Sequence, residues 1–276
     1  MVVDGKALSK EVITAVRATL SQLTGEPVLV VLVVGDDPVT TRFVRMKSLV
    51  AHEAGVQMEV KNFPSTAKEE DLIDAISASA SRVDVTGIIV QLPLPLHIDA
   101  DRVLSAIPVE KDVDVLNKNA IANVRMGTSP ILPPVAAAVQ YILERSGVSV
   151  AGKEVLVVGN GKLVGAPVAL LMRHNDAHVT VIDRPISDLR RETLESEVII
   201  AGTGNPSLIT PDMVQDGAVL VDAGTSEQGG KIVGDIDPAC AQKASLFTPT
   251  PGGVGPLTVA MLFKNCAILY SRHVGT

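Results

Sequence analysis

The segment 154–183 constrains the fold more than any other part of this 276-residue chain. An apolar, mostly β-branched run at 155–158 ends in the seven residues 159–165, which read Gly-Asn-Gly-Lys-Leu-Val-Gly. A helix-like segment then leads into a second apolar run that stops at Asp183. The pattern predicts a strand, a glycine turn, a helix and a second strand, as in a doubly wound α/β sheet.

Three glycines of this turn have physical roles in binding a dinucleotide. Gly159 permits the tight turn out of the strand, Gly161 lets the backbone approach a pyrophosphate, and Gly165 allows close packing of the helix on the strand. The start of the helix adds backbone N–H groups and the positive end of its dipole. The third glycine stands one residue later than in G-x-G-x-x-G, so an ordinary turn of an α/β sheet stays an alternative. Asp183, which closes the second strand, favours cofactor binding.

Length and charge limit the class of protein. Two α/β domains are the better prediction, because the nucleotide-binding pattern begins only past the middle of the chain. The net charge of −7, without a cluster of Lys and Arg, argues against a nucleic-acid partner, and an aromatic content of 2% argues against base stacking. Cys240 and Cys266 are far apart, so we interpret them as reduced thiols and expect no metal site.

The chain also lacks the patterns of targeting and membrane insertion. Residues 1–6 show no basic segment followed by an apolar one, and the longest apolar runs have the length of strands. We therefore expect a soluble, cytoplasmic protein without a membrane partner.

Strands and helices are predicted to alternate along the chain. Before the glycine turn, strands are predicted at 28–34, 57–63 and 87–92, helices at 8–23, 40–54, 68–80, 102–107 and 135–147, and an irregular stretch at 108–134. After it, strands are predicted at 198–201 and 218–222, and a closing helix follows the Pro-Gly-rich segment that starts at 251. The expected fold is two doubly wound α/β domains, of which the second is a Rossmann-like dinucleotide-binding domain.

Lys47 is a candidate for proton transfer. It shares one stripe of the predicted helix 40–54 with three apolar residues, Phe43, Val50 and Ala54. A lysine in such a place commonly extends its ammonium to solvent. If the ammonium is instead partly removed from water, its pKa falls and it can transfer protons near neutral pH.

Polar residues at two further places are candidates for a site. Gln91 ends a buried apolar run at the carboxyl side of the predicted sheet, where ligands bind in open α/β folds, although a surface residue fits there too. Asp112 and Asp114 point the same way if the chain is extended. Lys111 beside them also fits a solvated charged loop.

These motifs together resemble the methylenetetrahydrofolate dehydrogenase/cyclohydrolase family (FolD-type), in order and spacing, over nearly the whole chain. The segments 91–95 and 251–256 are the most specific. The resemblance is carried by Thr40-x-x-Phe43-x-x-x-Lys47, 90–95 (Val-Gln-Leu-Pro-Leu-Pro), 111–114 (Lys-Asp-Val-Asp), 159–165 with Pro167, 234–237 (Gly-Asp-Ile-Asp) and 248–256 (Thr-Pro-Thr-Pro-Gly-Gly-Val-Gly-Pro) with Thr258.

The resemblance implies a bifunctional oxidoreductase and hydrolase of one-carbon metabolism. In such an enzyme, 5,10-methylenetetrahydrofolate gives up a hydride to a nicotinamide dinucleotide, and water opens the resulting methenyl cation to 10-formyltetrahydrofolate. One cleft between the two domains would serve both steps. By position, Lys47 would be the general acid/base, Gln91 would orient it, and Asp114 would hold the pterin ring.

The same resemblance implies the other binding residues and the domains. Its folate-binding catalytic domain would be 1–125 with 257–276, its NAD(P)-binding domain would be 126–256, and the latter would form a homodimer. The substrate-binding residues would be Phe43, Pro251, Gly252 and Gly253. The cofactor-binding residues would be Gly159, Asn160, Gly161, Gly165, Asp183, Arg184 and Thr225.

Some residues of the folate-binding part depart from the family pattern. Phe43 stands where the family usually has Tyr, so a hydroxyl is missing, and Val115 stands where Gly usually follows the aspartate. The segment 130–134 reads Pro-Ile-Leu-Pro-Pro, without the usual thiol and hydroxyl. A dehydrogenase with little cyclohydrolase activity, or a non-catalytic folate- or nucleotide-binding paralogue, therefore stays an alternative.

The cofactor loop departs as well. Relatives that use NADP generally read Gly-Arg-Ser where this chain has Gly159, Asn160 and Gly161. The groups that would bind the 2′-phosphate are thus absent, whereas Asp183 suits a free ribose 2′-OH. Because Lys162 and Arg184 could supply positive charge, both NADP, typical of the family, and NAD, favoured by these residues, stay open.

Overall fold

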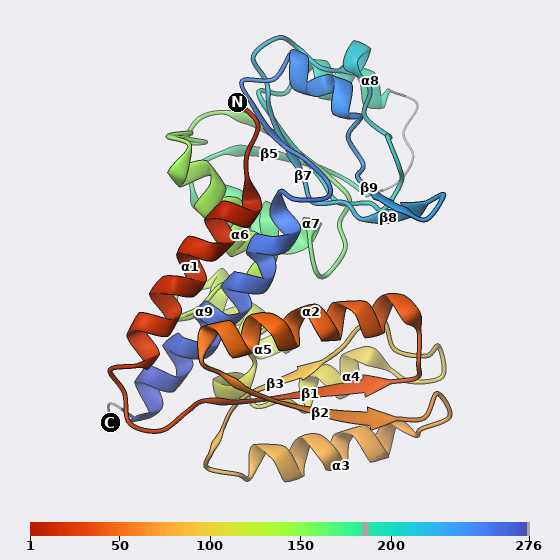
Figure 1. Ribbon diagram of the computed structural model, residues 1–276. Helices are drawn as coiled ribbons and strands as arrows, with labels where there is room; N and C mark the ends of the chain where they lie inside the picture. The colour runs from red at the N-terminus through yellow and green to blue at the C-terminus, as the bar shows by residue number, and fades with distance from the viewer. Residues whose placement is uncertain (184–187, 275–276) are drawn as a thin grey trace. The chain divides into compact units, whose positions relative to one another are not determined.

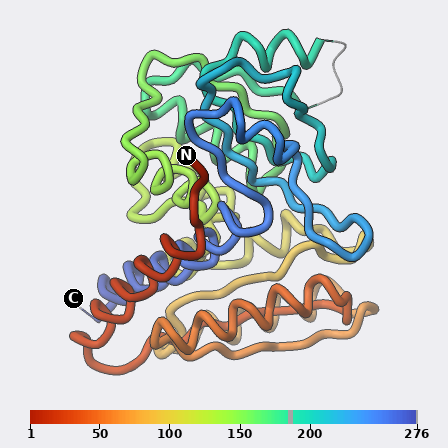
Figure 2. Tube along the Cα trace, turned by 45° about the horizontal axis from the view of Figure 1, so that its top comes forward, coloured from red at the N-terminus to blue at the C-terminus, as the bar shows by residue number. Residues whose placement is uncertain are grey.

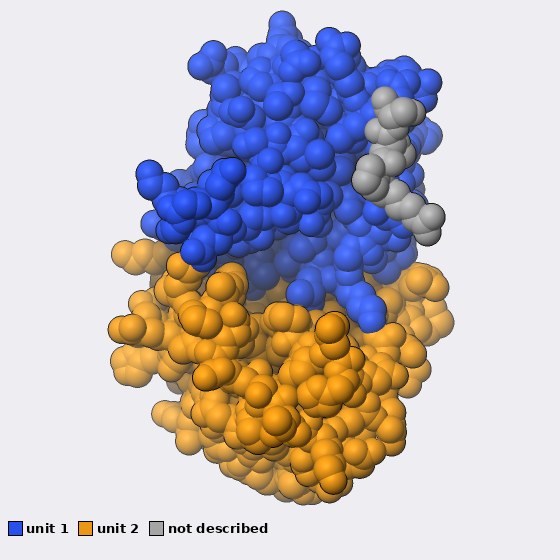
Figure 3. Space-filling view, turned by 90° about the vertical axis from the view of Figure 1, so that its right-hand side faces the viewer, with its two compact units in different colours: residues 1–9, 135–258 blue, residues 10–134, 259–276 orange. Residues whose placement is uncertain are grey.

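The computed structural model describes residues 1–183 and 188–274. The chain divides into two compact units (Figure 3). The first unit consists of 1–9 and 135–258, and the second consists of 10–134 and the residues from Val259 onward. The expected domains differ from these units chiefly at 1–9 and 126–134, and at the C-terminal limit by two residues.

The second unit is built on a three-stranded parallel sheet in the order β2-β1-β3 (Figure 1). Its strands are β1 (Val28–Val34), β2 (Gln57–Phe63) and β3 (Val85–Val90). β1 and β3 are buried along their whole length, which fits the continuous apolar sequence of β1 and the apolar run 88–90 of β3, whereas β2 lies at an edge and is partly exposed. Because β1 lies between the other two strands, the chain winds in both directions from it.

Helices cover both faces of this sheet, with α2 on one face and α3 on the other (Figure 1). The side chain of Asp37 starts α2 by accepting the N–H of Thr40, Pro38 occupies its first position, and the left-handed Gly55 ends it. The helices of this part of the chain are α2 (Pro38–Ala54), α3 (Glu69–Ala80), α4 (Ala100–Ser105) and α5 (Lys118–Arg125), together with α1 (Gly5–Leu20) and α9 (Val254–Val274), which both begin in the first unit.

The first unit contains a five-stranded parallel sheet in the order β10-β7-β6-β4-β5. Its strands are β4 (Glu154–Val158), β5 (His178–Ile182), β6 (Val198–Ala201), β7 (Val219–Asp222) and β10 (Leu246–Thr248). Its other elements include α6 (Pro134–Arg145), α7 (Gly165–His174), α8 (Leu189–Glu195), the hairpin of β8 (Ser226–Gln228) and β9 (Lys231–Val233), and the 3₁₀ turns Pro211–Met213 and Pro238–Gln242.

The first residues of the chain extend this sheet. Val2 forms a parallel bridge with Phe247 of β10, and the N–H of Gly5 donates to the carbonyl of Gly252 at 2.9 Å. A Cβ on Gly5 would lie 1.8 Å from the carbonyl oxygen of Gly253, so only glycine fits at this contact.

Helix α9 is apolar and long enough to cross a membrane by length and composition alone. More than half of its most apolar stretch is buried within the protein, as in the core helix of a globular domain. Figures 1 and 2 show α9 alongside α1, and the hydroxyl of Tyr270 donates to the carbonyl of Thr24 at 2.6 Å. Cys240 and Cys266 are both buried free thiols, and burial raises their pKa values to about 11 and about 12.

The predicted fold class is confirmed, and the predicted strands 28–34, 57–63 and 198–201 have the observed bounds. The prediction of an irregular stretch at 108–134 is wrong, because it contains α5 and a 3₁₀ turn, Val109–Lys111. Helix α5 has only eight residues and begins where the side chain of Asn117 accepts the N–H of Asn119. A segment of two turns is too short to show a helical period clearly.

Candidate active site

Lys47 and Gln91 form the centre of a candidate site in the second unit. Lys47 lies in α2, and Gln91 directly follows β3. Lys47 Nζ donates to Gln91 Oε1 at 2.8 Å, and Gln91 Nε2 donates to the carbonyl of Leu92, also at 2.8 Å. Because the amide nitrogen is engaged with a carbonyl, the amide must present its oxygen to the ammonium. The two groups therefore orient one another.

The surroundings of Lys47 on α2 are only partly as expected. Ala54 of the predicted stripe is fully buried, but Phe43 is 41% exposed and Lys47 itself is half-buried. The ammonium does not simply extend to solvent, because Gln91 accepts a hydrogen bond from it. The structure thus places Phe43 one turn before Lys47 on a face that leaves its ring accessible.

Asp114 lies within electrostatic reach of Lys47. Burial raises the pKa of its carboxyl, and the positive charge of Lys47 opposes that rise. A parallel bridge between Ile88 and Asp112 places this segment beside β3, the strand that leads to Gln91. The second unit therefore brings together the three residues for which the sequence predicts catalytic roles.

Asp112 differs from Asp114 because it is fully buried and supports the backbone. Its Oδ2 accepts the N–H groups of Leu116 at 2.8 Å and Asn117 at 2.7 Å, while its Oδ1 has no partner in the described part of the chain. Burial raises its pKa to about 6, the N–H donors lower it, and the charge of Asp114 raises it. The extended conformation in which Asp112 and Asp114 would point the same way is not observed, because residues 113 and 114 form a turn.

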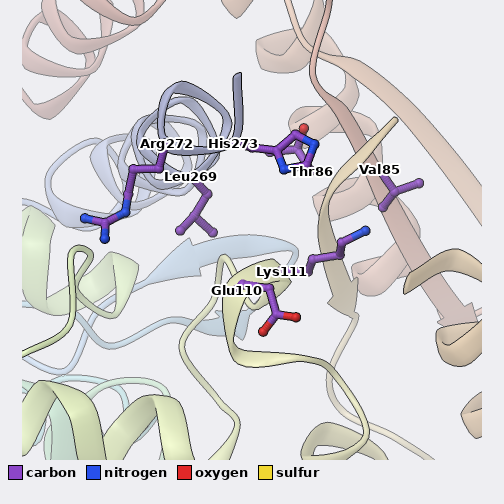
Figure 4. Close-up of a pocket in the computed structure, with 7 residues that line it drawn as sticks. All are labelled: Val85, Thr86, Glu110, Lys111, Leu269, Arg272 and His273. Carbon is purple, nitrogen blue, oxygen red and sulfur yellow. The ribbon is translucent and has the colours of Figure 1, made fainter. Parts of the chain in front are cut away.

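The alternative of a solvated charged loop does not describe Lys111, whose ammonium is bound by backbone carbonyls. Its Nζ donates to the carbonyls of Ala80 and Arg82, both at 2.8 Å. Lys111 also lines a cavity of about 230 Å³ at the amino end of β3 (Figure 4). Since β3 spans six residues, roughly 20 Å separate this cavity from Gln91, so it is not part of the Lys47 site. The cavity is lined by Val85, Thr86, Glu110, Lys111, Leu269, Arg272 and His273.

Val115, directly after Asp114, adopts a strained backbone conformation. Its φ is +57°, in the left-handed region that disfavours β-branched residues, and its side chain is 1% exposed. The glycine usual in similar sequences would adopt this conformation freely. The strain therefore lies next to the carboxylate expected to bind the pterin.

We expect Val115→Gly to be at least as stable as Val115→Ala in urea unfolding. Both variants empty the same buried space, but alanine keeps a Cβ in the left-handed region, which costs about 1–2 kcal/mol. Val113 is equally buried and has no positive φ, so there the alanine variant should be more stable than the glycine variant by roughly 0.5–1 kcal/mol. An alanine variant that is the more stable at both positions would contradict strain at Val115.

The glycine turn forms a second candidate site, in the first unit. Gly159 has a φ of +102°, and its N–H donates to the carbonyl of Ile182 at 2.6 Å. A Cβ on Gly165 would lie 1.9 Å from the carbonyl oxygen of Gly159, whereas one on Gly161 would meet no atom of the described residues within 4 Å. Among residues 1–183 and 188–274, no side chain caps the start of α7. The turn thus fits the pyrophosphate of a dinucleotide, with close packing at Gly165 and open space at Gly161.

Other predicted cofactor residues lie at the same edge of the sheet. Asp183 directly follows β5 and is exposed, and the hydrogen bond between Gly159 and Ile182 brings it beside the turn. Asn160 is exposed within the turn, and Thr225 is exposed after β7. Arg184 lies outside the described residues.

The predicted substrate residues Pro251, Gly252 and Gly253 belong to the first unit, whereas Lys47 and its partners belong to the second. Gly252 has a φ of +110°, and the N–H of Gly253 donates to the carbonyl of Pro249 at 2.7 Å. The start of α1 also contacts this turn at Gly5, so it is fixed on two sides. Across 1–183 and 188–274, no group of three or more His, Cys, Asp or Glu side chains is arranged to hold a metal ion.

The sequence patterns indicate no function for two buried carboxylates, Asp222 and Asp235. Asp222 ends β7, and Asp235 follows β9, and both accept several backbone N–H groups at the carboxyl edge of the sheet. Asp235 belongs to the Gly-Asp-Ile-Asp segment that contributes to the family resemblance, but nothing in its spacing indicates a partner. Only the fold shows which loops it contacts.

Family models match both parts of the chain. The catalytic domain of tetrahydrofolate dehydrogenase/cyclohydrolase matches residues 3–114, and the NAD(P)-binding domain of the same family matches residues 133–274. The chain belongs to the tetrahydrofolate dehydrogenase/cyclohydrolase family. The predicted family is thereby confirmed.

Full-length relatives of the tetrahydrofolate dehydrogenase/cyclohydrolase family agree with this assignment. The bifunctional protein FolD of Moorella thermoacetica is 39% identical over 269 residues, which cover 96% of each chain. The crystal structure of the bifunctional FolD from Campylobacter jejuni gives a TM-score of 0.95 at 33% identity and 99% coverage of each chain. The FolD of Trypanosoma brucei, complexed with NADP and an inhibitor, gives 0.95 at 32% identity, covering 100% of this chain and 99% of that one.

Proposed function

We propose that this protein oxidises 5,10-methylenetetrahydrofolate with a nicotinamide dinucleotide and hydrolyses the 5,10-methenyl product to 10-formyltetrahydrofolate. Family membership along the whole chain supports both activities. The observation that carries the proposal is the hydrogen bond between Lys47 and Gln91 beside the charge of Asp114. A non-catalytic paralogue would have no need of this arrangement.

In the hydrolysis, Lys47 would move protons at Nζ. Water adds to the one-carbon bridge and gives one proton to Lys47 Nζ, which acts in this step as the neutral amine. That proton passes to N5 as the bond between the carbon and N5 breaks, and the remaining hydroxyl proton leaves to solvent as the formyl C=O forms. Gln91 Oε1 would keep Nζ pointed at the reacting carbon, because it accepts a hydrogen bond from one of the N–H groups on Nζ. Asp114 would hold the pterin ring through its carboxylate.

In the oxidation, the chain would bind and orient both reactants. The bound nicotinamide supplies the chemistry by accepting a hydride from the one-carbon bridge. The residues that would hold the dinucleotide are Gly159, Gly161 and Gly165 at the pyrophosphate and Asp183 at the ribose, with Asn160 and Thr225 nearby. Phe43, Pro251, Gly252 and Gly253 would contact the folate.

We infer that NAD is the preferred dinucleotide. The exposed carboxylate of Asp183 suits the free 2′-OH of NAD and would repel the 2′-phosphate of NADP. Asn160 and Gly161 offer neither the guanidinium nor the hydroxyl that typically bind this phosphate. On the basis of the family resemblance, we also propose that the protein acts in the cytoplasm as a homodimer formed through the first unit.

Absorbance assays of the purified protein test the proposed function. We expect 5,10-methylenetetrahydrofolate to reduce NAD, and we expect 5,10-methenyltetrahydrofolate to be hydrolysed without any dinucleotide. Reduction without hydrolysis would instead support the dehydrogenase with little cyclohydrolase activity, for which Phe43 and Ile131 give reasons. Calorimetric binding of both ligands without turnover would support the non-catalytic paralogue.

A further inference from the structure

We propose that Asp235 is a positioning residue for the dinucleotide, because its carboxylate holds the loop after β6, residues 202–204, against the glycine turn. The proposal rests on the proposed function, since it assumes that the glycine turn binds the cofactor. It adds a residue that has no exposed surface and therefore acts only through the loop.

The strand order places this loop at the expected ligand crevice. The chain passes from β4 to β5 on one side and then through α8 to β6 on the other side of β4. In open α/β sheets, ligands bind outside the carboxyl ends of the strands where the order reverses in this way. Gly159 follows β4 and Gly202 follows β6, so both flank this point.

The two loops are in direct contact. A Cβ on Gly159 would lie 2.6 Å from the carbonyl oxygen of Gly202 and 3.3 Å from Cγ2 of Thr203. Any movement of residues 202–204 therefore changes the space around Gly159, where the pyrophosphate would lie. The position of this loop is consequently part of the binding geometry.

Asp235 fixes the loop with one carboxylate oxygen. Its Oδ2 accepts the N–H of Thr203 at 2.5 Å, the hydroxyl of Thr203 at 2.9 Å and the N–H of Gly204 at 3.2 Å. Hydrogen bonds to an ionised acceptor are stronger than neutral ones, and burial excludes competing water. Neutralising this group should therefore release the loop.

Asp222 in turn fixes Asp235. Its Oδ1 accepts the N–H groups of Gly224 and Asp235 at 3.0 and 3.1 Å, and its Oδ2 accepts the N–H of Ile236 at 3.1 Å. A Cβ on Gly224 would lie 2.2 Å from Oδ1 of Asp235, so the missing side chain leaves room for this carboxylate. Oδ1 of Asp235 has no hydrogen-bond partner among residues 1–183 and 188–274. Among the described residues, the hydrogen bonds of this carboxylate are therefore all made by Oδ2, to Thr203 and Gly204.

The experiment compares Asp235→Ala and Asp235→Asn with a matched control, Asp237→Asn. Asp237 lies two residues away, and within the described part of the chain its side chain accepts only the N–H of Ala239. Fluorescence titration with NADH and with NADPH gives the dissociation constant of each dinucleotide. Hydrolysis of 5,10-methenyltetrahydrofolate gives a second rate, which is measured in the absence of dinucleotide. Together they separate a displaced loop from a general loss of folding.

We expect the dissociation constant of the preferred dinucleotide to rise about tenfold in Asp235→Ala and about threefold in Asp235→Asn, which keeps one oxygen acceptor. The KM for this dinucleotide should rise in parallel, while hydrolysis and the Asp237→Asn control stay within about twofold of the unmodified protein. If Asp235→Ala does not fold, the dissociation constant of Asp235→Asn alone decides whether Asp235 positions the dinucleotide.

Two results would overturn the proposal. One is an unchanged dissociation constant in Asp235→Asn and Asp235→Ala, and the other is a fall in hydrolysis that matches the loss of dinucleotide affinity. An unmodified protein that binds NADH or NADPH but turns over no folate would refute the proposed function alone, and the titration would still decide the role of Asp235.

Discussion

Replacing Lys47 with Met should lower the rate of hydrolysis of 5,10-methenyltetrahydrofolate by about 10²- to 10⁴-fold, the usual contribution of a general acid/base. Methionine keeps a long flexible side chain on α2 but has no group that can give or take a proton. Gln91 Oε1 also loses the hydrogen bond that it accepts from Lys47 Nζ at 2.8 Å. The measurement is the decay of methenyl absorbance under single-substrate conditions without dinucleotide.

Arg45→Met is the matched control for this variant. Arg45 lies on the same helix, is exposed, and loses its positive charge in the same substitution, so we expect a change of no more than about twofold. The affinity for NADH should be unaltered in both variants, because the glycine turn belongs to the other unit. Full hydrolysis by Lys47→Met would remove Lys47 from the proposed mechanism.

Replacing Asp183 with Asn should lower the preference for NAD over NADP by about 10²-fold in kcat/KM, because the carboxylate no longer repels the 2′-phosphate. The amide can still bind the free 2′-OH, so most of the change should be a gain with NADP rather than a loss with NAD. Initial rates with both dinucleotides at several concentrations give the two ratios.

Asp176→Asn provides the control for charge alone. Asp176 is exposed and precedes β5, whereas Asp183 follows it, so the two lie at opposite ends of one strand. Its substitution should leave the ratio unchanged, since the 2′-phosphate would bind at the carboxyl edge of the sheet. Equal shifts in both variants would indicate a general electrostatic effect, and no shift in Asp183→Asn would separate this residue from cofactor choice.

The parts of the fold that could be predicted from the sequence are those with a strong local pattern. The run at 28–34 is apolar throughout because β1 is buried on both sides, so its bounds are visible in the sequence. Strand β10 has three residues and α5 has eight, and each is stabilised mainly by its neighbours in the fold. Such elements carry too few residues for a period to be recognised.

Some residues of the candidate site could likewise be predicted from the sequence, and others could not. The positions of Lys47 on a helix and Gln91 at a strand end follow from local patterns, but they lie 44 residues apart, and only the order of β1 and β3 brings them within hydrogen-bonding distance. The strain at Val115 and the contacts of Asp235 depend on turns whose geometry is set by long-range packing. These features therefore needed the structure.

The pairing of Val2 with Phe247 also has a consequence for the order in which the protein assembles. A ribosome releases the first residues of the chain early, yet the strand that they join is completed only when residue 247 has left the exit tunnel. The second unit consists mainly of residues 10–134, which contain all three strands of its sheet, so this sheet can form while synthesis continues. The first unit instead completes its sheet only after residues 246–248 have been synthesised, and its N-terminal segment stays unpaired with β10 until then.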